Sequence, residues 1–416
     1  MALLHLSGPG GEDPQGVSTT AIHAGVEPTG PWRSLVPPLV QSTTYVQEGV
    51  GLNPEHAYSR VSNPTVSALE RQLGALEGAP ASVCFGSGLA AETALFLSLL
   101  KSGDHVVLGD AIYGGTVRLF RQVLSGLGIT STFVDTSDAA NVGRAIRPET
   151  RLVFIETPAN PTLKLTDIAA VSRVTRAAGI PLAVDNTFLT PVIQRPLELG
   201  ADISVYATTK HIEGHSAAIG GAITSRDGAV LERLRFIRKC TGGIQAAFQA
   251  WLTINGVKTL PLRIRRHSEN ALEVARWLAR NEHVERVYYP GLPGFAQREL
   301  AERQHTGVGG ALHGGVVSFE VKGGVEAGVR VLEGVELCAL VEHVGSVETL
   351  ITHPATMTHA DVPREQREGA GISDGFIRLS VGLEDPADII RDLERAISLA
   401  HTGGVRRVPA AQGVPA

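Results

Sequence analysis

Cysteine is scarce in this sequence. Cys84, Cys240 and Cys338 are the only three among 416 residues, and they lie far apart. An odd number of cysteines without CxxC spacing predicts neither a disulfide framework nor a cysteine-ligated metal, and it is typical of proteins in reducing compartments. We therefore expect a cytoplasmic protein.

Long apolar runs and strongly basic segments are also missing. No run reaches the eighteen or so apolar residues that a membrane-spanning helix requires. The segment MALLHLSGPGGEDPQG has no basic region before its short apolar run, so we expect no secretory leader. The densest basic runs, RIRRH at 263–267 and VRR at 405–407, lack interleaved aromatic residues, and the formal net charge is −5. We expect these runs to be solvated surface, and neither a membrane nor a nucleic acid to be a partner.

The chain is long enough for two domains. Its 416 residues are 43% hydrophobic and 19% charged, which predicts an ordinary globular protein with a large core. Residues 1–60 are rich in proline and glycine without a sustained period, so we expect an extended arm that contacts a neighbouring subunit. We expect a large domain at 61–255, a smaller α/β domain at 256–401 and a disordered tail at 402–416.

Short apolar runs alternate with helical patterns from residue 65 onward. The helical patterns cover 65–78, 88–101, 114–126 and 166–178, and the runs between them are SVCF, HVVLGD, TSTFVD, RLVFIE, PLAVDN and DISVYA. This alternation predicts an α/β fold with a largely parallel sheet and helices on both faces. After a long helical stretch at 245–282, the runs VERVYY, VVSFEV, ELCAL and FIRLSV alternate with fewer helices, which indicates the smaller domain.

Candidate site residues follow the predicted strands, because ligands of open parallel sheets bind beyond the carboxyl ends of the strands. The first strand end is CFGSGLAAE, where Gly86, Ser87 and Gly88 precede a predicted helix whose start attracts a phosphate. The same residues match G-x-G-x-x-A, with Asp110 at the end of the next strand. A dinucleotide, another phosphate ligand and a purely structural turn all remain open here.

Two further strand ends carry charged residues. PLAVDNTF places Asp185 where it either caps the next helix or binds a ligand. DISVYATTK places Thr208, Thr209 and Lys210 together, and the few flanking charges argue against a solvated surface lysine. A lysine, an aspartate and a phosphate loop are the parts of a pyridoxal phosphate site: an amine that bonds to the cofactor, a carboxylate for its ring nitrogen and an anion site.

The same stretch offers a metal-binding alternative, because His211 and His215 are four residues apart. However, Glu213 is not at the H-E-x-x-H position, Gly214 weakens a helix and no third ligand follows. We therefore expect no metal.

Many motifs in order resemble one enzyme family over about residues 18–400. They are TTAIHAG, QSTTY, YSRVSNPT, GSGLAAE, DAIYGGTVRLF, IETPANPT, VDNTF, TTKHIEGHS, VYYPGLP, HPATMTH and IRLSVGLED. The sequence resembles the Cys/Met-metabolism family of pyridoxal phosphate enzymes, which includes cystathionine γ-lyase, cystathionine γ-synthase and the homoserine-ester sulfhydrylases. The resemblance implies a fold-type I architecture, pyridoxal 5′-phosphate as the cofactor, and a homotetramer built as a dimer of dimers with active sites between subunits.

The resemblance also implies roles for individual residues. It implies that Lys210 bonds to the cofactor and later moves protons, and that Asp185 binds the ring nitrogen. Tyr113 is expected to stack on the ring and act as an acid or base. Asn160 and Arg378 are expected to bind the α-carboxylate of the substrate, whose shape the planar fork of arginine matches. The implied phosphate ligands are Gly88, Leu89 and Thr209, with Tyr58 and Arg60 from the neighbouring subunit.

Several positions depart from the commonest pattern of the family. Ala207 stands where a phosphate-binding serine is usual, Ala217 replaces an aspartate and Ala57 stands where the cystathionine enzymes often have glutamate. His343, in EHVGS, occupies a position near the substrate carboxylate that is usually serine. Glu342 matches an acid that reads the distal ammonium of cystathionine. The sequence thus implies the cofactor but does not identify the preferred substrate.

The activity implied by the resemblance is γ-elimination or γ-replacement on sulfur-containing or O-acylated amino acids. A cystathionine γ-lyase or γ-synthase is favoured, with an O-acyl-homoserine sulfhydrylase or a methionine γ-lyase as alternatives within the family. A nicotinamide-dependent oxidoreductase is the alternative from another class, but it leaves Lys210 and Arg378 unexplained. A non-catalytic homologue is expected to lack the lysine or the aspartate, and both are present.

Overall fold

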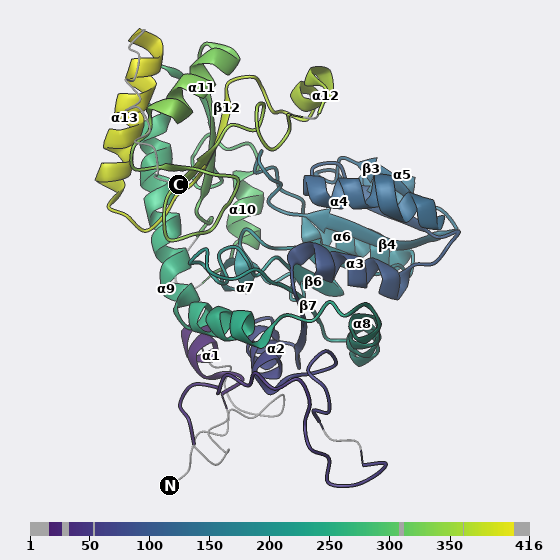
Figure 1. The fold of residues 1–416 in the computed structure, drawn as a ribbon. Helices are drawn as coiled ribbons and strands as arrows, with labels where there is room; N and C mark the ends of the chain where they lie inside the picture. Colours follow the sequence, from purple (N-terminus) through teal and green to yellow (C-terminus); the bar gives the residue numbers. More distant parts are fainter. Residues whose placement is uncertain (1–15, 27–32, 53–54, 308–311, 361, 403–416) are drawn as a thin grey trace, which may run out of the picture.

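The computed structural model describes residues 16–26, 33–52, 55–307, 312–360 and 362–402, which form two sheets surrounded by helices (Figure 1). The predicted tail at 402–416 lies outside the described residues except for Thr402, as do parts of the predicted arm. No helix within these ranges is both long and apolar enough to cross a membrane.

The larger sheet has seven strands within the described residues, in the order β1-β7-β6-β5-β4-β2-β3. Their bounds are β1 Ser82–Phe85, β2 His105–Gly109, β3 Thr130–Val134, β4 Thr150–Glu156, β5 Leu182–Asp185, β6 Ile203–Tyr206 and β7 Gly221–Ser225. Strands β3, β2, β4, β5 and β6 pair in parallel, and β7 pairs antiparallel with both β6 and β1. Strand β1 therefore runs in the same direction as β6, and the predicted, mostly parallel sheet is confirmed.

Helices cover both faces of this sheet because buried side chains alternate along its strands. Val106 and Leu108 of β2 belong to the core beneath α3 (Gly88–Leu99) and α8 (Gly228–Thr241), whereas Val107 faces α5 (Ala139–Ala145) and α6 (Ile168–Ala177). Helix α2 (Pro64–Leu76) packs beside β1 and β7. The short helices α4 (Gly114–Arg118) and α7 (Thr190–Ile193) follow β2 and β5.

The smaller sheet has the order β10-β11-β12-β9-β8 within the described residues. Its strands are β8 Val284–Tyr288, β9 Val316–Val321, β10 Ala339–Leu340, β11 Leu350–Thr352 and β12 Phe376–Ser380. Helices α11 (Gly324–Gly334) and α13 (Pro386–Thr402) pack on it, and α10 (Arg298–Gln304) and α12 (Arg364–Gly369) lie in its connections.

Helix α9 (Ala247–Leu278) joins the two cores, running from α1 and α2 to α13 (Figure 1). Ile254 and Ile264 pack in the core with α2, whereas Val274 and Leu278 pack beneath the smaller sheet. The predicted domain boundary after residue 255 falls inside this helix, and the core contacts of α9 change after Ile264. The division into domains stays a prediction.

Several elements differ from the sequence-based expectations. Part of the predicted arm forms α1 (Val17–His23), whose Val17 and Ala21 are buried against α2 and α9. The single helix predicted at 114–126 is α4 followed by π-helical and 3₁₀ segments at 119–124 and 125–127. Strands β7 and β11 were not predicted. The run at 263–267 is solvated surface only in part, because Arg263 is 5% exposed and His267 is fully buried, whereas the Arg266 side chain is 46% exposed.

Candidate active site

The ends of β1 and β6 lie against each other, although β7 separates these strands. Helix α3 begins directly after β1, and the Ser87 hydroxyl accepts a hydrogen bond from the Ala90 amide at 3.1 Å. A Cβ atom at Gly88 would lie only 2.8 Å from the Cβ of Ala207, so the start of α3 packs closely on the segment after β6. Leu89, the second residue of α3, is 36% exposed beside this contact.

The segment after β6 forms a tight turn that presents hydroxyl groups and Lys210. The Thr209 hydroxyl donates to the Gly220 carbonyl at 3.1 Å and accepts from the Gly220 amide at 3.0 Å. The Thr208 hydroxyl is buried and has no hydrogen-bond partner within the described part of the chain. This hydroxyl lies against Gly220, so both threonine hydroxyls pack on the segment that leads into β7.

The amine of Lys210 contacts a residue from the smaller sheet's side of the molecule. Its Nζ lies 3.0 Å from Nδ1 of His343, which stands in the loop between β10 and β11. Burial, and then the charge of Arg378, lower the pKa of Lys210 to about 8. Burial, Lys210 and Arg378 also lower the pKa of His343 to about 4, so a neutral imidazole faces the amine.

Arg378 of β12 is buried and joins three segments. Its Nη1 donates to the side chain of Asn160 at 3.0 Å, and its Nη2 donates to the His343 carbonyl at 3.0 Å and the Thr352 hydroxyl at 3.1 Å. Its Nε has no partner within the described residues, and burial lowers its pKa to about 10. The structure thus brings the predicted residues Lys210, Asn160, His343 and Arg378 together, with an unused guanidinium donor among them.

Asp185 ends β5 at the same sheet edge. Its carboxylate accepts the Thr187 amide at 2.9 Å, and the next helix, α7, has Leu189 as its N-cap without a side-chain cap. The helix-cap interpretation of Asp185 is therefore wrong. The Thr187 hydroxyl accepts the Ala207 amide at 2.8 Å, which joins the ends of β5 and β6. Burial raises the pKa of Asp185 above its usual range.

Two further acidic residues near Asp185 were missed in the sequence. Glu156, at the end of β4, accepts the backbone N–H of Tyr113 at 2.6 Å, and Glu92 of α3 accepts the Thr116 hydroxyl at 2.6 Å. Burial, and then the charge of Asp185, raise the pKa of Glu156 well above its usual range and that of Glu92 to about 8. The sequence could have indicated Glu156 as a site residue, since it is an acid at the end of the apolar run RLVFIE. No pattern in GLAAETAL distinguishes Glu92 from a surface glutamate.

Tyr58 and Arg60 do not join this cluster. The Arg60 guanidinium lies 5.3 Å from the ring centroid of Tyr58 and donates to the Lys239 carbonyl at 2.5 Å. Within the described residues, neither shares a hydrogen bond or ion pair with Lys210 or Asp185. Tyr58 is 43% exposed and thus open to contact from outside the chain.

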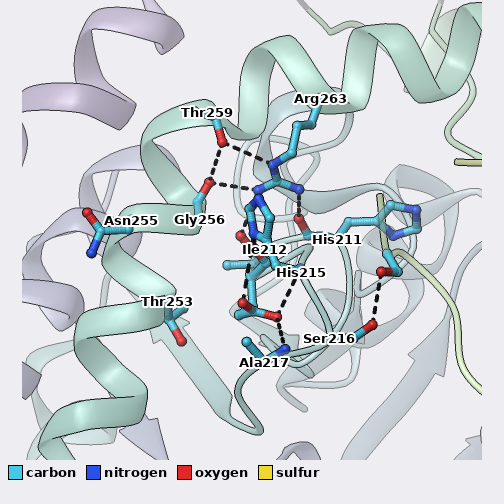
Figure 2. A network of polar contacts seen from close by, with 12 residues as sticks. His211, Ile212, His215, Ser216, Ala217, Thr253, Asn255, Gly256, Thr259 and Arg263 are labelled. Atoms are coloured by element: carbon cyan, nitrogen blue, oxygen red, sulfur yellow. Dashed lines mark hydrogen bonds and ion pairs between the residues drawn. The ribbon is translucent and has the colours of Figure 1, made fainter. Parts of the chain in front are cut away.

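The two histidines of the metal-binding alternative have different surroundings (Figure 2). The ring of His211 is buried 5.4 Å from that of His267, whereas Nδ1 of His215 contacts the backbone carbonyl of Glu213 at 2.7 Å. The Glu213 carboxylate accepts backbone N–H groups of His215 and Ala217 at 3.1 and 3.2 Å. The described residues contain no group of three or more histidine, cysteine or acidic side chains arranged to hold a metal ion.

Comparison with known proteins gives a consistent result. The chain is 44% identical over 390 residues to cystathionine γ-lyase of Mus musculus, covering 93% of this chain and 96% of that protein. It is 42% identical over 383 residues to cystathionine β-lyase of Coxiella burnetii, covering 92% and 97%. The crystal structure of metB from Corynebacterium glutamicum superposes with a TM-score of 0.88 at 42% identity, covering 93% of this chain and 99% of that one.

The family profile covers nearly the whole of the described chain. The profile described as Cys/Met metabolism PLP-dependent enzyme matches residues 18–398, which span both sheets and all three strand ends that carry the site. The chain therefore belongs to the Cys/Met metabolism family of pyridoxal-phosphate-dependent enzymes.

Proposed function

We propose that this protein is a carbon–sulfur lyase that removes the γ-substituent of cystathionine and related amino acids. The observation that carries the proposal is that the Lys210 amine and the buried, incompletely paired guanidinium of Arg378 both contact His343. An amine and a carboxylate-binding site are what an enzyme of this family needs to act on an α-amino acid. The mammalian and Bacillus subtilis relatives named cystathionine γ-lyase support this substrate class.

The residues present fit pyridoxal phosphate. Asp185 is a buried carboxylate without a lysine or arginine partner among the described residues, so it can bind a protonated ring nitrogen. The first N–H groups of α3, at Gly88 and Leu89, offer donors for the phosphate, and we infer that the Thr209 hydroxyl exchanges its bond with the Gly220 carbonyl for one with the phosphate. The half-buried Lys210 supplies the amine, made more reactive by its lowered pKa.

The reaction follows from what each side chain does to the substrate. When bound, the cofactor supplies an electron sink for charge that develops at Cα of the substrate. Arg378 and Asn160 hold the α-carboxylate, and the Lys210 amine takes the proton from Cα and moves it onward. The backbone N–H of Tyr113 donates to Glu156 and fixes the start of α4, and the Tyr113 hydroxyl protonates the departing sulfur or oxygen. Hydrolysis by water then completes elimination, whereas capture by an added thiol gives replacement.

The proposal includes the oligomeric state and the location of the protein in the cell. We infer a homotetramer, in which the exposed Tyr58 and Arg60 reach the phosphate of a neighbouring subunit. The three cysteines are free, and we place the protein in the cytoplasm on this ground.

Subunit mixing tests this arrangement. Arg60→Ala subunits lose the arm contact and Lys210→Ala subunits lose the amine, so each homo-oligomer is inactive. A hybrid dimer regains one intact site, and an equal mixture recovers up to about a quarter of the wild-type activity. The measurement is turnover after verified subunit exchange.

The matched control is a mixture of Arg60→Ala with Tyr58→Phe, because both substitutions damage the arm and every hybrid site lacks one of its residues. We expect no recovery from that mixture. If the Arg60→Ala and Lys210→Ala mixture also stays inactive after exchange, the arm belongs to the site of its own subunit.

Substrate preference tests the proposed function itself. Purified wild-type enzyme is expected to convert L-cystathionine to a keto acid, ammonia and a thiol product. It is also expected to turn over O-acyl-homoserine, with only a small difference in kcat/KM between the two substrates. Glu342 is exposed beside Arg378, and Ala57 supplies no second acid. Because an exposed ion pair contributes roughly 0–1 kcal/mol, Glu342→Ala should lower kcat/KM for cystathionine by up to about fivefold and leave that for O-acyl-homoserine unchanged.

The ratio of the two kcat/KM values is the readout, and Ala57→Glu is the matched gain-of-charge variant that should raise it. An unchanged ratio in Glu342→Ala means that this carboxylate does not bind the distal ammonium group of cystathionine. Absence of cystathionine cleavage with turnover of O-acyl-homoserine and a thiol would make a sulfhydrylase the correct assignment.

A further inference from the structure

A buried arginine on α9 contacts the turn that follows Lys210 (Figure 2). Arg263 points from the helix into this turn. Its Nη1 donates to the backbone carbonyl of His211 at 2.7 Å, and its Nη2 donates to that of Ile212 at 3.1 Å. His211 and Ile212 are the first two residues after Lys210, and their exposed fractions are 0% and 1%.

The same guanidinium is fixed on its own helix. Arg263 Nη2 also donates to the Gly256 carbonyl at 2.7 Å, and Nε donates to the Thr259 hydroxyl at 3.1 Å. Both acceptors lie toward the N-terminus of α9, the direction in which long helical side chains lean. Every nitrogen of this buried cation is therefore hydrogen-bonded, which offsets the cost of removing it from water.

The turn needs these donors because its backbone cannot supply them. The Lys210 carbonyl accepts the Gly214 amide at 2.8 Å, but within the described residues no backbone N–H reaches the carbonyls of His211 or Ile212. A buried carbonyl without a partner is costly, so the guanidinium takes the place of missing backbone donors. Its planar fork spans two successive carbonyls, which a lysine ammonium does not match.

Close packing leaves the turn no room to shift. Gly214 has φ +78°, and a Cβ there would lie 1.9 Å from Nη1 of Arg263, so only glycine fits. A Cβ at Gly256 would lie 2.3 Å from the carbonyl oxygen of Glu213. The loop between β10 and β11 also contacts the turn, because the Val347 amide donates to the Gly214 carbonyl at 2.9 Å. The turn is thus held between α9 and the loop that carries His343.

We propose that Arg263 is a positioning residue for the amine of Lys210. By fixing the two carbonyls after Lys210, it sets the direction in which the lysine side chain leaves the turn toward His343, 3.0 Å away. Arg263 acts only through the backbone of the turn and touches neither the amine nor the substrate. The inference rests on the proposed function of Lys210.

Substitution of Arg263 tests the inference in the full-length holoenzyme. Arg263→Met removes all the donors, and Arg263→Lys keeps the charge but loses the fork. A displaced amine lowers kcat by roughly 10- to 100-fold while KM changes less than about threefold, because the carboxylate site is intact. The matched control is Arg266→Met on the same helix, whose side chain is 46% exposed and 3.7 Å from Asp385.

A second readout does not depend on turnover. The full-length protein, stripped of cofactor, is labelled with an amine-acylating reagent over a range of pH, and the Lys210 peptide is followed by mass spectrometry. The midpoint for Lys210 starts near the pKa of about 8 and rises in both Arg263 variants, because a displaced amine regains water. His343 and Arg378, the groups that face the amine, are unchanged in these variants. Internal references are Lys101, Lys164, Lys239, Lys258 and Lys322.

The outcomes are distinct. If Arg263→Lys and Arg263→Met match Arg266→Met in kcat and in the Lys210 midpoint, Arg263 does not position the amine. If Arg263→Met does not fold, the kcat and the Lys210 midpoint of Arg263→Lys test the proposal. If neither variant folds, Arg263 is a residue required for folding and the proposal is overturned. If the wild-type enzyme does not cleave cystathionine, the proposed function is refuted. A shifted Lys210 midpoint in the Arg263 variants would still support the positioning role of Arg263.

Discussion

Replacing Lys210 with alanine is expected to abolish turnover. The lost proton transfer alone lowers kcat by about 10²- to 10⁴-fold, and loss of the covalent bond to the cofactor adds to this. The Lys210 amine is the one that the fold places beside His343 and Arg378, at the same sheet edge as Asp185. The measurements are kcat with cystathionine and the site of covalent labelling after borohydride reduction of the wild-type enzyme, mapped by mass spectrometry.

Lys164→Ala is the matched control. Lys164 follows the motif PANPT but pairs with Asp135 at 2.7 Å and is 39% exposed, so its removal should leave kcat within about twofold of wild type. Cofactor found on Lys164 or any other lysine after reduction would show that the assignment of Lys210 is wrong.

The second large effect is expected from Asp185→Asn. Asparagine keeps the shape of the side chain and its hydrogen bond with the Thr187 amide, but it leaves a cationic ring nitrogen buried without a counter-charge. Breaking a buried ion pair costs roughly 3–5 kcal/mol, so cofactor affinity should fall by about two to four orders of magnitude and kcat should fall with it. The dissociation constant of the cofactor is measured by titration of the stripped full-length protein.

Asp110→Asn provides the comparison, because Asp110 is an exposed aspartate directly after β2 at the same sheet edge. Its substitution should leave cofactor affinity within about twofold of wild type. Equal affinities in wild type and Asp185→Asn would mean that Asp185 does not bind the ring nitrogen. A strong effect of Asp110→Asn alone would mean that Asp110, rather than Asp185, binds the ring nitrogen of the cofactor.

The large sheet and the positions of Lys210 and Asp185 at its edge were predictable from the sequence. Apolar runs such as RLVFIE and PLAVDN are long enough to mark strands, and parallel strands bring their carboxyl ends to one edge. Strand β7, GAITS, was missed because its buried residues are mostly small. A Cβ at Gly221 would lie 2.2 Å from the Ser87 carbonyl oxygen, so this strand owes its place to close packing rather than to hydrophobic size.

Buried charged residues near the site were the other feature that could not be predicted from the sequence. Glu92 and Arg263 are buried although glutamate and arginine are almost always exposed, and local pattern assigns such residues to the surface. Arg263 even lies in a basic run, RIRRH, of which Arg266 is half exposed. Their surroundings come from segments far apart in the chain, so only the assembled fold shows that Arg263 meets the turn after Lys210.

The pairing of β1 with β7 has a consequence for the order of events during synthesis. The hydroxyls of Ser82 and Thr224 meet at 2.6 Å across 142 residues of chain, and β1 has no parallel neighbour among the described strands. While the chain is growing, the glycine loop after β1 is complete long before the strand that docks it beside Lys210. A contact of such long range is slow to form because loop closure must precede it. We therefore expect a ribosome-bound chain that stops before residue 221 to lack the cofactor site, even with Gly88, Asp185 and Lys210 already made.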